Sequence, residues 1–226
     1  STQQLALVQP MQQNIYREYR WHNGTFEQIS FPGLYPVTSR GEAEQLQQQA
    51  NSGQQVPWSN PLATAEQMAK DLLKWPLISS HDTVVSNNGT TAQVNLFQQS
   101  PQMKVNVTLS RLIQQTNNGL WFVTAAKTSG ISLKQISTPI TSPLSLRGAG
   151  VLADGQTTTT LFDHTLSPMA IGRSNVLTVN TSGNFAGNIT YTSSNMDQPG
   201  LLLIQSLPSS GSTEMGQVLL MSIIIG

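Results

Sequence analysis

Short apolar runs separated by turn residues fill the last third of the chain, residues 139–226. Valine, isoleucine and leucine dominate the runs, while Gly, Ser, Asn and Pro dominate the gaps. Regular short strands with such turns predict a β-sandwich. The most apolar run, 218–225, is far shorter than the roughly 20 residues of a membrane-spanning helix. Its β-branched content predicts a buried strand. The expected strands lie near 144–148, 157–162, 175–178, 185–191, 201–205 and 217–225.

Two helices are predicted in the first half of the chain. Ser39 and Glu42 have the spacing of a capping box, so a helix should start there and run to about Asn51. Thr64 and Gln67 form a second box, which predicts the start of another helix. Apolar residues at helical spacing follow it: Ala65, Met68, Ala69, Leu72 and Leu73.

Hairpins are predicted on both sides of these helices. The segment 15–31 carries aromatic residues around Asn23-Gly24, a strong two-residue turn signal. Residues 83–86 and 91–97 flank a second turn, and 103–109 alternates apolar and polar residues like a half-buried strand. Two helices followed by an antiparallel meander predict an α+β layer, with the helices on one face of a curved sheet.

The expected fold class is therefore α+β plus all-β. We predict an N-terminal arm and β-hairpin at 1–35, an α+β domain at 36–128, a linker at 129–138 and a β-sandwich at 139–226. The chain shows no signal peptide or initiator Met, which suggests a mature or trimmed form. Any leader or lipidated cysteine is expected upstream of the first residue.

The composition limits the kinds of molecule that this protein is expected to bind. Only 10% of residues are charged and the net charge is zero, against about 25% charged residues in typical soluble domains. This balance argues against nucleic-acid binding and against an electrostatic membrane anchor. The chain has no cysteine, which excludes disulfides and thiolate metal sites. An uncharged, hydrogen-bonding surface without disulfides favours an extracytoplasmic bacterial protein.

No residue pattern in the sequence predicts catalysis, a metal site or a cofactor. The three histidines, His22, His81 and His164, fall in separate segments, so no i, i+4 metal pair forms. Asp82 and Asp163 each neighbour a histidine, but adjacent residues on a strand point to opposite faces. Phosphate-loop, nucleophile-elbow and calcium-loop patterns are absent from the sequence. We expect a protein that is not an enzyme.

Two tryptophans are the candidate ligand-binding residues. Trp58 lies in a Pro-flanked segment expected to be an exposed loop, and Trp121 ends the predicted meander. Aromatic rings at the mouth of an α+β layer could stack on a sugar or an apolar ligand. Packing in the core is the competing interpretation of both residues.

The C-terminal region, 139–226, carries a set of short motifs: Ser142-Pro143-Leu144, Gly148, Gly183-Asn184-Phe185, Ile189-Thr190-Tyr191, Pro199-Gly200-Leu201-Leu202 and the final strand at 218–224. With these motifs the region resembles the immunoglobulin-like domain of bacterial spore-germination and related envelope proteins. A sparse set of acidic residues and a long loop at 164–174 depart from that pattern.

In the middle region, 36–128, the predicted helices precede long strands that end in Gly119-Leu120-Trp121-Phe122-Val123. In this order of elements the region resembles the cone-shaped nuclear-transport-factor-2-like fold. That superfamily contains enzymes, binding proteins and assembly modules, so the fold alone does not choose among them. The pairing of the two regions resembles predicted bacterial lipoproteins of spore-forming lineages.

These resemblances imply a non-catalytic, secreted or lipid-anchored bacterial protein that acts in envelope or spore-surface assembly through protein or cell-wall contacts. Residues 157–160 are the candidate edge strand for pairing with a partner, although they could equally form an ordinary sandwich strand. One alternative is a small-ligand or carbohydrate-binding protein that uses the cone pocket. A second is a hydrolase or isomerase-like enzyme in the same cone.

Overall fold

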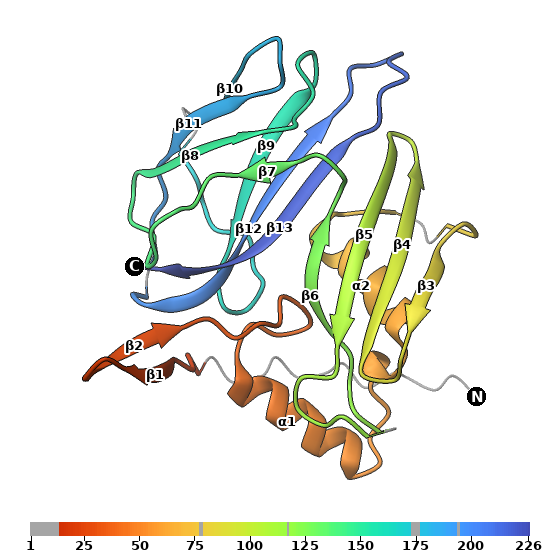
Figure 1. The fold of residues 1–226 in the computed structure, drawn as a ribbon, viewed down its shortest axis with the longest axis vertical. Coiled ribbons are helices and arrows are strands. Elements are labelled where there is room, and N and C mark those ends of the chain that lie inside the picture. Colours follow the sequence, from red (N-terminus) through yellow and green to blue (C-terminus); the bar gives the residue numbers. More distant parts are fainter. Residues whose placement is uncertain (1–13, 77–78, 117, 173–176, 194) are drawn as a thin grey trace, which may run out of the picture.

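The computed structural model describes residues 14–76, 79–116, 118–172, 177–193 and 195–226. The described chain is mostly β-strand, with few helices (Figure 1). The predicted arm lies largely outside the described residues, and so do residues 175–176 of the predicted strand near 175–178. Among the described residues, none of the helices has both the length and the apolar character that crossing a bilayer requires.

Three β-sheets are present in the described chain. The main sheet contains, in spatial order, β3 (Thr83–Asn87), β4 (Thr91–Gln99), β5 (Gln102–Ser110), β6 (Phe122–Lys127), β13 (Gln217–Ile225), β12 (Gln198–Leu207) and β9 (Gln156–Phe162). The second sheet contains β10 (Thr178–Val179), β11 (Phe185–Ile189), β8 (Leu144–Ala149) and β7 (Ser132–Leu133). Strands β1 (Glu18–His22) and β2 (Thr25–Ile29) form a separate ribbon.

The main sheet runs through both regions that the sequence separates. Strand β6 precedes the predicted linker at 129–138 and β13 follows it, yet the two strands pair antiparallel at Ala126 with Leu220 and at Lys127 with Leu219. The predicted linker itself contains the short strand β7. One sheet therefore connects the α+β region to the C-terminal strands.

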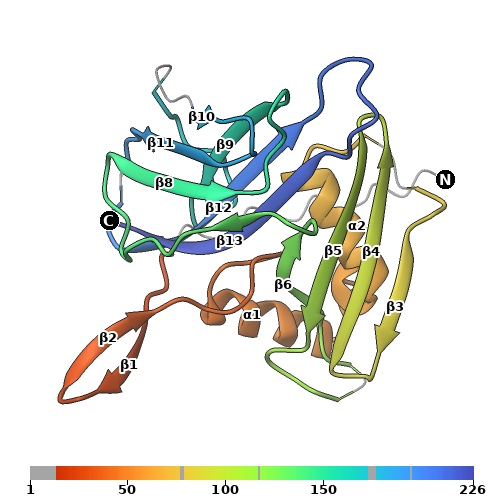
Figure 2. The same cartoon turned by 45° about the horizontal axis from the view of Figure 1, so that its top comes forward.

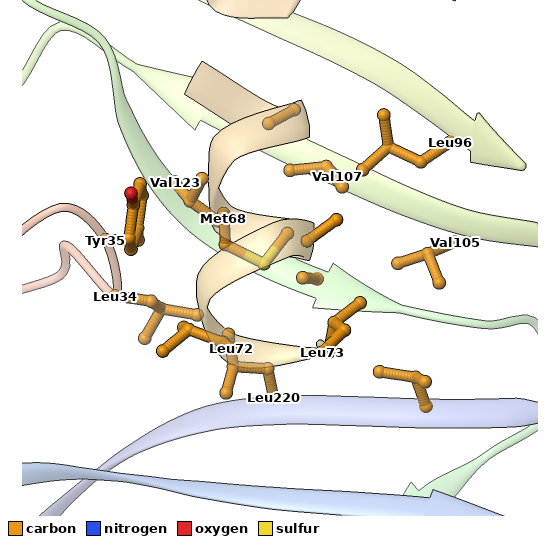
Figure 3. Packing of buried hydrophobic residues seen from close by; sticks show 14 of the residues in the cluster. Leu34, Tyr35, Met68, Leu72, Leu73, Leu96, Val105, Val107, Val123 and Leu220 are labelled. Carbon is orange, nitrogen blue, oxygen red and sulfur yellow. The ribbon is translucent and has the colours of Figure 1, made fainter. Parts of the chain in front are cut away.

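Strands β12 and β13 are covered on both faces. One face packs with the second sheet in a core that includes Leu146, Ile204 and Ile223. The opposite face joins the core beneath α2 through Leu203 and Leu220. Figure 3 shows Leu220 beside Leu72 in this core. This double cover explains why residues 201–204 form a continuous apolar run, because a strand buried on both faces has no polar side. The two packed sheets are compatible with a β-sandwich.

Helix α2 (Pro61–Leu72) begins earlier than the predicted box at Thr64. Asn60 is the N-cap, and its side-chain oxygen accepts hydrogen bonds from the amides of Leu62 and Ala63. Pro61 occupies the first helical position, where its missing amide costs nothing. The predicted apolar stripe is confirmed, since it packs against β4, β5 and β6. The helix ends at Leu72, ahead of Pro76.

Helix α1 (Arg40–Asn51) begins at the predicted N-cap, Ser39. The Ser39 hydroxyl accepts from the Glu42 amide at 3.4 Å and donates to the Glu42 carboxylate at 2.7 Å. In the usual capping box, the glutamate carboxylate accepts a hydrogen bond from the backbone amide of the N-cap residue. Here the carboxylate instead accepts from the side chain of the N-cap residue. A short 3₁₀ helix, η1 (Pro57–Ser59), connects the two α-helices. The helix α1 packs through Ala43 and Leu46 on Phe122 of β6.

Candidate functional site

The β1–β2 ribbon projects away from the two sheets (Figures 1 and 2). Its turn is Asn23-Gly24, as the sequence predicts, with φ angles of 48° and 82°. Two successive positive φ values are what a tight hairpin turn requires, and Asn-Gly adopts them at little cost. Each strand then places alternate residues on opposite faces of the ribbon.

One face of the ribbon is aromatic. Trp21 lies directly opposite Phe26, and their rings meet edge to face with centroids 4.8 Å apart. Tyr19 shares this face because it is two residues from Trp21 along β1. The three residues are 53% (Tyr19), 62% (Trp21) and 71% (Phe26) exposed. We call these three side chains the aromatic face.

The opposite face of the ribbon is charged. Glu27 contacts His22 Nδ1 at 3.1 Å and the Arg20 guanidinium at 3.8 Å. These side chains are about half exposed, so the ion pairs contribute little to stability. Glu18 accepts a hydrogen bond from the amide of Arg40 at 2.8 Å, which connects the ribbon to the first residue of α1.

The base of the ribbon is held by polar contacts with the loop before β12. Arg17 donates to the carbonyl oxygens of Met196 and Asp197, and the Gln28 side chain also donates to the Asp197 carbonyl. These bonds place Met196, which is 72% exposed, beside the base of the ribbon. The ribbon that carries the aromatic face is therefore fixed at its base by the fold.

The two candidate tryptophans lie together inside the α+β region. Trp121 is buried at 1% exposure, and the Arg111 guanidinium lies over its ring at 4.8 Å. Its amide donates to the Trp58 carbonyl oxygen at 2.8 Å. The half-buried Trp58 ring meets the Tyr35 ring edge-on, with centroids 5.2 Å apart. Both rings pack against core residues, and neither lines the pocket described next.

A pocket of about 390 Å³ opens between α2 and β4. Trp75 and Leu96 supply apolar walls, and Glu66 and Asp82 supply carboxylates. Burial raises the pKa of Glu66, and the negative charge of Asp82 raises that pKa further. Asp82 accepts hydrogen bonds from the amides of Ser79 and Phe97, at 3.1 and 2.7 Å. Sequence reasoning missed this pairing because Glu66 and Asp82 belong to different elements.

The histidines do not form the adjacent pairs considered in the sequence. The Asp82 carboxylate bonds to backbone amides, whereas His81 Nδ1 lies 3.4 Å from the Ser79 hydroxyl. His164 is buried, and its Nδ1 bonds to the Gln198 side-chain oxygen at 2.6 Å. Its Nε2 has no hydrogen-bonding partner among the described residues.

A buried carboxyl group lies near His164. Burial raises the pKa of Glu42, while the Ser39 hydrogen bond and the charge of His164 partly oppose that rise. Ser39, Glu42 and His164 are all less than 10% exposed. The sequence carried only the capping signal for this cluster, because His164 comes from the loop after β9, distant along the chain.

The described residues contain no group of three or more His, Asp or Glu side chains arranged to hold a metal ion. Comparison with known proteins adds no assignment: no family model, curated protein or solved structure matches the chain.

Proposed function

We propose that this protein is a non-catalytic binding protein that acts outside the cytoplasm of a bacterium, in envelope or spore-surface assembly. The observation that carries the proposal is the projecting aromatic face of the ribbon, formed by Tyr19, Trp21 and Phe26. Trp and Tyr are enriched among the residues that dominate binding energy at protein interfaces. Fully burying a large apolar side chain contributes about 1.5–3 kcal/mol. Covering this face would therefore supply substantial binding energy.

A protein partner fits the aromatic face better than a cell-wall glycan. Sugar binding needs polar groups that fix the hydroxyls beside the stacked ring. Gln28 lies opposite Tyr19 on this face, and both Gln28 and Arg17 already donate to the backbone of residues 196 and 197. Met196 adds an adaptable thioether to the exposed surface, as is frequent at protein-binding surfaces. We infer an apolar groove on a partner protein as the ligand.

The finer fold assignment belongs to the same proposal. Helix α2 against β4, β5 and β6 supports a cone-like layer of the nuclear-transport-factor-2-like type. The packing of β8 and β11 on β12 and β13 supports an immunoglobulin-like sandwich. Both folds occur in assembly modules of the bacterial envelope, which is the role proposed here.

The test uses two double variants of the same ribbon. Trp21→Ala/Phe26→Ala removes the aromatic pair, and Arg20→Ala/Glu27→Ala removes charges from the opposite face as the matched control. Each immobilised protein is incubated with solubilised bacterial envelope proteins and, separately, with purified cell-wall sacculi. We expect partner proteins to be retained by the wild type and the charge variant and lost with the aromatic variant. Equal retention by all three would contradict the proposal, and aromatic-dependent binding to sacculi alone would make the ligand a glycan.

A small-ligand role has one supporting observation, the pocket between α2 and β4. Its apolar walls and two carboxylates suit a compact ligand with a hydrogen-bonding or cationic group. A thermal-shift screen of small amines and sugars, repeated with Glu66→Gln, tests this role. A ligand that raises the melting temperature of the wild type and of the Glu66→Gln variant equally would bind elsewhere.

A further inference from the structure

Strand β9 is one end of the main sheet, and within the described chain it pairs with only one full strand, β12. A short segment covers the end of its free edge, where Met169 donates to the Leu161 carbonyl and Asp163 donates to the Ser167 carbonyl. Residues 156–160 have no backbone partner on that side among the described residues. The free edge therefore spans these five residues, Gln156 to Thr160.

The bonds at Leu161 and Asp163 show which backbone groups point outward. In an antiparallel strand, alternate residues direct both their amide and carbonyl to the same side. Since Leu161 and Asp163 bond away from β12, Thr157 and Thr159 also direct their amides and carbonyls away from it. The free edge thus presents two donors and two acceptors with the spacing of a further antiparallel strand.

The free edge of β9 also lacks the features that usually prevent pairing. Its sequence, Gln-Thr-Thr-Thr-Thr, contains no charge and no proline, and its register with β12 is continuous. Proteins block exposed edges with lysine, proline or bulges. The opposite end of the sheet, β3, is irregular in this way, because its register shifts between Val84 and Ser86. The two ends of one sheet therefore differ in their capacity to accept a strand.

We propose that the free edge of β9 pairs antiparallel with the same edge of a second copy, around a two-fold axis at Thr158. In this register Thr157 of each copy lies opposite Thr159 of the other copy, which gives two symmetric pairs. Each of these pairs exchanges two backbone hydrogen bonds, which makes four in all. The second strand stops at the covered Leu161 carbonyl, so the paired segment is short and we expect a reversible dimer.

The second copy is favoured over an unrelated peptide by self-complementarity. A two-fold contact places the same surface patch on both subunits. Thr157, Thr158 and Thr159 then meet only threonines, and cross-strand threonine pairs stabilise a sheet. The chain has zero net charge at pH 7, so long-range repulsion between copies is small. The proposed contact uses neither the ribbon nor the pocket and stands independently of the proposed function.

The absence of cysteine from the full chain permits a direct test of the register. Thr158 lies on the two-fold axis in a non-hydrogen-bonded pair, where Cα atoms are about 4.5 Å apart and a disulfide is possible. Two copies of Thr160, on the same face, are offset by four residues, or about 14 Å along the strands. We expect Thr158→Cys to form a disulfide dimer under mild oxidation and Thr160→Cys to remain monomeric. No dimer from Thr158→Cys, or equal dimer from both variants, would overturn the proposal.

A second measurement follows the unlinked protein by analytical ultracentrifugation across a concentration range. Thr157→Pro removes an outward amide and leaves the backbone hydrogen bonds to β12 in place, and proline is tolerated at such edge positions. It also deletes the Thr157 hydroxyl, which bonds to the Ser206 hydroxyl of β12 at 2.9 Å, so Thr157→Val, which loses the hydroxyl and keeps the amide, is the matched control. We expect the wild type to dimerise with rising concentration, the folded Thr157→Pro variant to lose the dimer, and Trp21→Ala/Phe26→Ala to match the wild type. A wild type that stays monomeric, or a proline variant that dimerises equally, would refute pairing through β9.

Discussion

The β12–β13 pair and the β1–β2 ribbon have the same local strand geometry, but the first is buried and the second is exposed. Both are antiparallel pairs of consecutive strands with large apolar side chains. The first is packed between the second sheet and α2, so its side chains form two cores. The second projects from the body and exposes its aromatic face. Alternation decides which side chains share a face, and only the neighbouring elements decide whether that face is core or surface.

The largest expected effect tests the double cover of β12. Leu203 faces the core beneath α2 and Ile204 faces the core beneath the second sheet. Replacing either by Ala should lower the free energy of unfolding by about 2–5 kcal/mol, because each change leaves a cavity in a packed core. Urea denaturation followed by tryptophan fluorescence and circular dichroism measures the loss. We expect one cooperative transition, since β12 is common to both cores; two separate transitions would show that the regions unfold independently.

A smaller effect tests how firmly α2 covers one of these faces. Asn60→Ala removes the side-chain oxygen that accepts from the amides of Leu62 and Ala63. Loss of an N-cap of this kind costs about 1 kcal/mol. Asn60→Asp keeps the acceptor and serves as the control, with unfolding expected near the wild-type value. An Asn60→Ala variant with wild-type stability would place the start of the helix elsewhere.

The sequence predicted local features well and contacts between distant segments poorly. The Asn23-Gly24 turn and the Ser39 cap depend on a few adjacent residues, and both are confirmed. The Asn60-Pro61 start of α2 is equally local, and its residue types are sufficient to identify it, so the later start predicted from Thr64 and Gln67 is wrong. By contrast, the apolar run at 218–225 predicts burial of β13 but carries no information on its pairing with β6.

The candidate sites show the same difference between features set by adjacent residues and contacts between distant segments. Alternation within 15–31 was sufficient to place Trp21 and Phe26 in one hairpin, but their exposure depends on the absence of a covering element among the described residues. The approach of Glu42 to His164 depends on how α1 docks beside the loop after β9. No local pattern encodes that docking, because the two residues lie far apart along the chain.

An exposed and a buried glutamate show the same contrast between surface and core for charged side chains. Glu27 is half exposed on the ribbon, whereas Glu42 is buried and its pKa is raised, mainly by burial. A raised pKa in the folded state means that Glu42 stabilises the fold fully below its unfolded pKa near 4.5, and that this stability is lost as the pH rises through the raised value. Glu42→Gln removes the charge and retains an oxygen that can accept from Ser39.

We therefore expect Glu42→Gln to gain stability relative to the wild type as the pH rises from 4 to 7. Urea denaturation of both proteins at several pH values measures this difference. Glu27→Gln makes the same substitution on the exposed ribbon, outside any core, and is the matched control for the chemical change itself. A difference between the Glu42→Gln variant and the wild type that is independent of pH would contradict a raised pKa for this carboxyl.

The smallest effect on stability is expected where we expect the largest effect on binding. Trp21→Ala should lower the free energy of unfolding by only about 0.5 kcal/mol, the low end for an aromatic pair, since the edge-to-face pair is exposed and little area is buried. Trp21→Phe retains an aromatic ring opposite Phe26 and is the control. The same urea titration used for Leu203→Ala measures both variants. A loss comparable to that of Leu203→Ala would mean that the aromatic face is part of a core, because only a buried side chain contributes that much. A Trp21→Ala variant with wild-type stability and no partner binding would mean that the aromatic face serves binding and not folding. The β12–β13 pair would then differ from the ribbon in that its apolar side chains serve folding.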